Sequence, residues 1–237
     1  MKCSLTPNRP VFALLLTSLC VTTCPAQEAN VTHEPAVEPI NVGLGFPADS
    51  YFASAEGRKI LKYLVRCALE GNTRAQVTLP DEKLILNGSI GLAPGWIHRP
   101  LRLDEQRWVS ACVYALTNKM GKSVRVSLSG SHPKLTSAET GHKISSLFEG
   151  GFFGNLFLPT PIAYVCEGSD RKKLSKYPIG SLRLCAKPSG KTTKDGKVLS
   201  ECGFIITGPC SSPSSFVVEG EFYKEVVQVW LPTEQGE

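Results

Sequence analysis

The chain has 237 residues and a formal net charge of +5, and 42% of its residues are hydrophobic, 20% charged and 8% aromatic. This composition excludes an intrinsically disordered chain, a collagen and a coiled coil, because the apolar content suffices for a core. The length corresponds to one domain or two small ones. The nine cysteines are informative, since an odd number is unusual in an exported protein that forms disulfides.

The N-terminus has the pattern of a signal peptide at 1–26. Two basic residues precede thirteen uncharged residues at 11–23, a run shorter than the roughly 20 residues of a membrane-spanning helix. Small residues follow, and we predict cleavage after Ala26. The pattern therefore indicates a secreted or periplasmic protein. A lipid anchor at Cys24 and a buried N-terminal helix are the alternatives.

Two helices are predicted in the N-terminal half of the chain that remains. Residues 27–50 come first; they contain three prolines and no helical or strand period, so we predict an exposed leader there. Apolar residues then recur at helical spacing over 56–69 and again over 104–120. For the second helix we expect Asp104 as the N-cap and a stop at Gly121.

Elsewhere apolar and polar residues alternate, which predicts half-buried strands. The strands outnumber the helices and do not alternate with them along the chain. We therefore predict a single globular α+β domain at 51–237 with a mostly antiparallel sheet. The predicted strands cover 74–79, 84–90, 124–128, 151–158, 162–167, 181–186, 202–207, 215–219 and 222–231.

Cleavage after Ala26 would remove three of the nine cysteines and lower the net charge from +5 to +3. The six that remain predict up to three disulfides in an oxidising compartment. Two of them, Cys67 and Cys112, lie in the two predicted helices, so a bridge or close packing between those helices fits the sequence. The six cysteines are Cys67, Cys112, Cys166, Cys185, Cys202 and Cys210.

The pairing of the later cysteines stays open. A bridge between Cys202 and Cys210 conflicts with a straight strand that begins at Cys202, because too few residues remain for the chain to return. Cys185 and Cys202 flank a lysine-rich segment, and we favour their pairing. A hairpin turn at 195–196, however, would place Cys185 opposite Ile206 instead.

The chain carries no motif that identifies an enzyme. Cys112 lies in the middle of a helix on its apolar face, which is typical of a structural cysteine and not of a nucleophile. Ser131 and Lys134 have the spacing of a serine–lysine pair but lack its companion motifs. The sequence also contains no metal-binding spacing and no glycine-rich phosphate loop, so we expect no metal and no cofactor.

Two segments are candidate ligand surfaces. Residues 149–157 (EGGFFGNLF) combine glycines with phenylalanines, which indicates either a buried strand, the interpretation we favour, or an aromatic-lined pocket. The loop at 91–98 holds a tryptophan and a histidine that would form a ligand rim or cover the edge of the core. The candidate ligand-binding residues are Trp96, His98, Glu149, Phe152 and Asn155.

A third segment, 171–197, is strongly basic. It contains nine lysine or arginine residues and one acid, a net charge of +8, so the rest of the cleaved chain carries −5. The interpretation we favour is a solvated loop and edge strand whose lysines prevent aggregation, because Tyr177 is the single aromatic residue among them. The alternative is a surface that attracts an anionic envelope polymer, with Lys172, Lys173 and Lys176 as candidates. The export signal argues against a nucleic-acid partner.

Three stretches resemble a family of exported, uncharacterised bacterial proteins. They are WVSAC at 108–112, EGGFFGNLF at 149–157 and YVCEGSD at 164–170, and the likeness covers about half of the chain, 57–170. The resemblance supports export and structural cysteines. It implies no reaction, ligand or catalytic residue.

We therefore expect an exported cell-envelope protein with a binding or structural role and no transmembrane span after cleavage. Its partner would be an anionic envelope polymer or another envelope protein. The alternative is a hydrolase acting on envelope peptide or glycan, with a pocket formed by 91–98 and 149–155 and with Glu149 or His142 as the acid or base.

Overall fold

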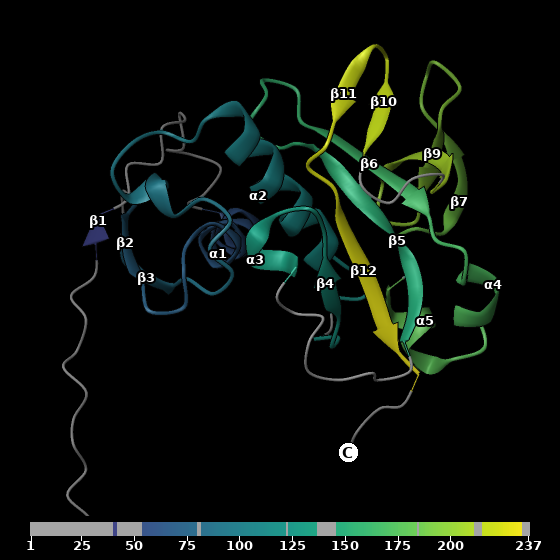
Figure 1. Ribbon diagram of the computed structural model, residues 1–237, viewed down its shortest axis with the longest axis horizontal. Coiled ribbons are helices and arrows are strands. Elements are labelled where there is room, and N and C mark those ends of the chain that lie inside the picture. The colour runs from purple at the N-terminus through teal and green to yellow at the C-terminus, as the bar shows by residue number, and fades with distance from the viewer. Residues whose placement is uncertain are drawn as a thin grey trace, which may run out of the picture. The chain divides into compact units, whose positions relative to one another are not determined.

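The computed structural model confirms an α+β fold with largely antiparallel sheets (Figure 1). It also contains three disulfides. All described residues belong to one compact unit, Val37–Glu237. The predicted signal peptide, the Cys24 anchor site and most of the predicted leader lie outside them. The structure describes residues 40–41, 54–79, 82–121, 123–136, 146–183, 185–210 and 215–233.

The first part of the unit is a three-stranded sheet covered by a helix. Strand β1 (Ile40–Asn41) pairs in parallel with β2 (Arg74–Thr78), and β2 pairs antiparallel with β3 (Lys83–Asn87). Helix α1 (Ala55–Ala68) begins where the Ser54 hydroxyl accepts from a backbone N–H, as an N-cap does. Strand β1 falls within the predicted leader; two residues are too few to produce a strand period.

Helix α2 (Leu103–Leu116) differs from its prediction at both ends. Asp104 is not the N-cap, because Glu105 accepts from the Arg102 backbone N–H at 2.9 Å and the helix begins one residue earlier than expected. At the other end the backbone becomes extended at Thr117, well before Gly121. The early stop coincides with a side chain from another element that binds the last carbonyls of α2, as described below.

The larger sheet has seven strands in the order β4-β12-β5-β6-β9-β8-β7. Its paired strands are antiparallel except for β6 and β9, which are parallel. A separate hairpin consists of β10 (Phe216–Val218) and β11 (Glu221–Tyr223). The seven strands are β4 (Ser127–Ser129), β5 (Ser146–Asn155), β6 (Ile162–Glu167), β7 (Pro188–Thr192), β8 (Val198–Ser200), β9 (Ile205–Pro209) and β12 (Val227–Pro232).

Short helices occupy parts of the chain for which we predicted strands or loops. The strand prediction for 181–186 is wrong, because the first three of these residues belong to α5 (Pro178–Arg183), and a proline at the first position favours a helix. Helix α4 (Arg171–Leu174) lies in the basic segment. The remaining short helices are the 3₁₀ helix η1 (Pro94–Ile97) and α3 (Pro133–Thr136).

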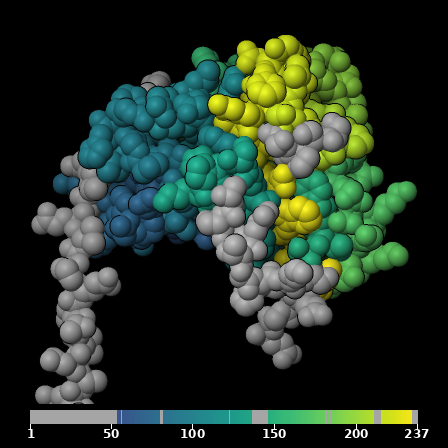
Figure 2. Space-filling model, viewed as in Figure 1, coloured from purple at the N-terminus to yellow at the C-terminus, as the bar shows by residue number. Residues whose placement is uncertain are grey.

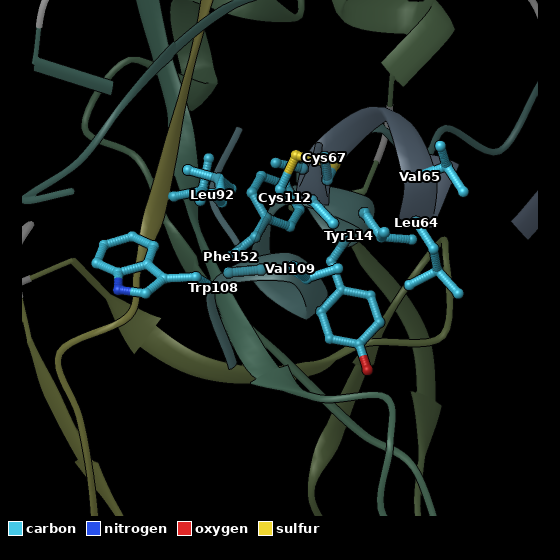
Figure 3. Close-up of a cluster of buried hydrophobic side chains, with 14 of the residues drawn as sticks. Leu64, Val65, Cys67, Leu92, Trp108, Val109, Cys112, Tyr114 and Phe152 are labelled. Carbon is cyan, nitrogen blue, oxygen red and sulfur yellow. A yellow bond between two sulfur atoms is a disulfide. The ribbon is translucent and has the colours of Figure 1, made fainter. Parts of the chain in front are cut away.

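The main core lies between α1, α2 and the large sheet (Figure 3). Leu64 and Val65 of α1, Val109 and Cys112 of α2 and Phe152 of β5 belong to this core. A second cluster, under the β10–β11 hairpin, stacks aromatic rings at centroid distances between 4.8 and 5.8 Å. Its buried members are Phe153, Tyr164, Tyr223 and Val226.

The six cysteines form three disulfides. Cys67–Cys112 joins α1 to α2, and Cys185–Cys202 is the pairing we favoured. Strands β7 and β8 allow that pairing because the chain turns over 193–197, where hydrogen bonds close a wider loop than the two-residue turn at Asp195-Gly196. The third bridge, Cys166–Cys210, ties β6 to the residue that follows β9.

Candidate anion-binding site

The centre of the site is a buried ion pair between Glu149 and Arg183. Glu149 lies on β5 and Arg183 at the end of α5, and they are 4% and 1% exposed. The Nε and Nη2 atoms of Arg183 both lie 2.9 Å from Oε2 of Glu149. Burying two charges is costly unless they are paired and hydrogen-bonded, and this geometry supplies both.

Arg183 also determines where α2 ends. Its Nη2 and Nη1 atoms donate to the backbone carbonyls of Ala115 and Thr117, both at 2.8 Å. The last carbonyls of a helix have no partner within the helix, so a donor at this place satisfies them. One side chain therefore joins α2, β5 and α5.

Glu149 is only partly satisfied by this contact. Its Oε1 is buried and has no hydrogen-bond partner among the residues that the structure describes. Burial raises the pKa of Glu149, and the Arg183 charge opposes that rise. The second oxygen is thus an acceptor that a guest molecule or a water would satisfy.

A pocket of about 490 Å³ opens beside this ion pair, and its lining comes from α4, α5, the segment after α5 and the adjoining ends of β5 and β12. Its volume is that of a small-molecule site, for which roughly 300–1,000 Å³ is usual. Apolar and cationic side chains predominate in the lining. The lining residues are Glu149, Arg171, Lys172, Leu174, Ser175, Gly180, Arg183, Ala186, Lys187, Pro188 and Leu231.

Helix α4 is anchored so that its lysines face outward. The Phe148 backbone N–H donates to Asp170 at 3.1 Å, and Leu174 is buried beneath the helix. Lys173 also binds Asp170, at 2.8 Å, and together these two donors lower the pKa of Asp170. In Figure 2 long side chains of the green part of the chain, which contains α4, project into solvent.

The basic segment is thus partly neutralised and partly free. Arg171 pairs with Glu167, and Lys197 pairs with Asp195 and Glu219. Lys173 pairs with Asp170, as described above. The remaining lysines of the segment are exposed and form no ion pair with any carboxylate of the described residues; we call them the free lysines. They are Lys172, Lys176, Lys187, Lys191 and Lys194.

Four of the five predicted ligand-binding residues do not line this pocket. Trp96, Phe152 and Asn155 are at most 1% exposed, while His98 is exposed on the loop after η1. Asn155 is used locally: it donates to Gln106 at 3.2 Å and accepts from a backbone N–H. Residues 149–155 therefore form the buried strand that we favoured.

Two glycines of this strand, Gly150 and Gly154, lie where the backbone of the neighbouring strand comes close. A Cβ atom at Gly150 would overlap the Cys166 carbonyl oxygen of the neighbouring strand. At Gly154 a Cβ would overlap the Ile162 carbonyl oxygen, and the backbone φ is +131°, which other residues rarely adopt.

Of the predicted ligand-binding and polyanion-binding residues, Glu149 and Lys172 line the pocket, and Lys173 and Lys176 do not. Sequence reasoning missed Arg183, whose only signal is a single arginine between leucines in an otherwise apolar segment. Sequence reasoning also did not distinguish Lys173, which pairs with Asp170, from the free lysines Lys172 and Lys176.

Nothing in the described residues assembles the pocket of the hydrolase alternative. Residues 91–98 contribute no lining to the pocket beside Glu149, and His142 lies outside the described residues. Within the described ranges, no three His, Cys, Asp or Glu side chains are grouped as metal ligands. No helix in the same ranges has the length and apolar content needed to cross a membrane.

Comparison of the chain with protein-family models, with curated proteins and with solved structures found no match. The function has to be argued from the site itself.

Proposed function

We propose that this protein is an exported cell-envelope protein that binds an anionic envelope polymer through its basic surface. The observation that carries the proposal is the set of free lysines, which α4, the segment after α5 and the β7–β8 hairpin present to solvent without carboxylate partners among the described residues. Unpaired cations gathered in one segment produce a positive potential that attracts a polyanion.

The cations of the segment 171–197 fall into two groups, those paired with carboxylates and those that are not. Four cations of the segment 171–197 are held by carboxylates, which fixes the local fold. The five free lysines form no ion pair of this kind within the described residues. Lys119 binds Glu201 directly and lowers the pKa of Glu201, and two of the free lysines, Lys187 and Lys191, add to this lowering.

Export is supported by the signal-peptide pattern and by the disulfides. Three bridges are typical of proteins that mature in an oxidising compartment, outside the cytosol. An anionic polymer such as lipopolysaccharide, an acidic glycan or a teichoic acid is the corresponding partner in such a place.

Chromatography on three matched matrices tests the proposal. Phosphocellulose and carboxymethyl cellulose present phosphate and carboxylate on the same polymer, and plain cellulose is the neutral control. We expect retention on one or both anionic matrices at low salt, release as the salt concentration rises, and no retention on plain cellulose. A protein that passes through both anionic matrices at low salt would contradict the proposed function.

A further inference from the structure

We infer that the pocket between α4 and α5 is a separate small-molecule site for an anionic amphiphile, that is, a phosphate or carboxylate group attached to an apolar portion. This goes beyond the proposed function, which requires only the exposed lysines and leaves the pocket unused. The inference rests on the distribution of charge between the mouth and the interior of the pocket.

The interior offers an apolar surface. Leu174, Ala186 and Leu231 all belong to the lining. They are packed into the protein, with 5%, 2% and 0% of their surface exposed, so they form a fixed wall. Gly180 and Pro188 add further uncharged surface. When an apolar group moves from water into this space, the binding free energy becomes more favourable by about 25 cal/mol for each Å² of apolar surface that is buried.

Among the described residues, the interior offers no free positive charge. Arg183 is the only one of their cations that lines the pocket and is also buried, and it is occupied by Glu149 and by two backbone carbonyls. A second anion placed deep in the pocket would also face the Glu149 carboxylate. The anionic group of a ligand is therefore disfavoured at the bottom of the pocket.

The mouth carries the free charge. Lys172 and Lys187 come from two different elements, line the pocket and are exposed, without a carboxylate partner in the described ranges. An anionic group bound there would orient the ligand with its apolar portion inward. Glu149 also lines the pocket, and its Oε1 is a buried acceptor without a partner among the described residues.

The probes for a direct test share a chain and differ in the head group. Decyl phosphate and decanoate, both below their critical micelle concentrations, present phosphate and carboxylate. Decyl maltoside has the same chain without charge, and inorganic phosphate has the charge without a chain. By isothermal titration calorimetry we expect one saturable site for decyl phosphate, decanoate or both. The two single-feature probes should bind about tenfold or more weakly.

Two variants assign the binding to the pocket. Ser175→Trp places a large ring at an exposed position of the lining and should abolish binding of the decyl anion. Its matched control is Thr192→Trp on β7, an exposed residue outside the lining, which should bind like the wild type. Lys172→Glu combined with Lys187→Glu should weaken the decyl anion about tenfold and leave decyl maltoside unchanged.

The results separate this inference from the proposed function. If neither decyl anion saturates a site, if inorganic phosphate binds as tightly as decyl phosphate, or if Ser175→Trp binds like Thr192→Trp, the inference is wrong, whatever the cellulose matrices show. If the decyl anion binds while both anionic matrices fail to retain the protein, the pocket assignment stands and the polymer proposal falls. Circular dichroism of each variant checks that it is folded.

Discussion

Arg183 binds Glu149 across 2.9 Å inside the protein, although 34 residues separate them in the chain. The same guanidinium donates to two carbonyls at the end of α2. The basic segment is therefore not a solvated loop throughout: one of its cations lies in the core and fixes α5 against β5. That contact also places the lysines on either side of α5 around one pocket.

Removing the arginine should destabilise the protein strongly. Arg183→Met leaves the Glu149 charge buried without a partner and two carbonyls without donors, and we expect a loss of roughly 3–5 kcal/mol in the free energy of unfolding. Urea denaturation measures it. The double variant Arg183→Met/Glu149→Leu, which removes both charges, should lose clearly less. Equal losses in the two variants would show that the charge pair is not the source of the effect.

The start of α2 predicts a pH dependence of stability. Hydrogen bonds from Arg99, at 2.7 and 2.6 Å, and from the Arg102 backbone N–H lower the pKa of Glu105. Because the folded-state pKa lies below the unfolded one, this contribution is present above the unfolded pKa and is lost as pH falls through the folded value. The free energy of unfolding at about pH 3 should therefore fall further below its neutral value in the wild type than in Glu105→Gln. If the free energy of unfolding falls equally with pH in the wild type and in Glu105→Gln, Glu105 does not have this role.

The glycine at 150 should not tolerate a methyl group. Gly150→Ala forces a Cβ against the carbonyl oxygen of Cys166, which belongs to the paired strand and has little room to move. We expect a loss of about 2 kcal/mol or more in urea denaturation, within the usual range for overpacking. Gly71→Ala is the matched control, because the nearest atom to its Cβ would be 3.8 Å away. If both variants unfold at the same urea concentration, the close strand approach is not as described.

The disulfides should leave no free thiol. Protein that begins at Gln27 contains six cysteines, and all six are bridged. Thiol titration after denaturation without reductant should therefore find no reactive thiol, whereas six would contradict the pairing. Replacing both Cys67 and Cys112 by alanine removes the bridge between α1 and α2, and we expect it to cost roughly 2–5 kcal/mol.

The sequence predicted the elements that have a clear period. Helix α1 and strand β6 lie within one or two residues of their predicted ranges, because apolar side chains recur there at the spacing of each element. Strands β7 and β8 were not predicted, since β7 consists largely of polar residues and β8 has three residues. Helices α4 and α5 have four and six residues, too few to show a helical period.

The site was predictable only in part for a related reason. The charge of the segment 171–197 is visible in the sequence, but its partners are set by the fold. Arg183 meets a strand residue 34 positions away, whereas Lys173 meets Asp170 three positions away. Local spacing indicates the second contact and contains no information on the first. The aromatic residue Phe152 was correctly favoured as buried, because large apolar side chains fill cores more often than they line surfaces.

The most direct test of the account compares two variants of equal net charge. Lys172→Glu/Lys176→Glu reverses two free lysines on and beside α4, four positions apart. Lys59→Glu/Lys62→Glu reverses two exposed lysines on α1, three positions apart. The measurement is affinity for soluble inorganic polyphosphate at low salt. We predict that the first variant binds about tenfold more weakly than the wild type, about 1.4 kcal/mol, and that it also binds clearly more weakly than the second. Equal affinities of the two variants would mean that net charge alone attracts the polymer, and would contradict a binding surface at α4.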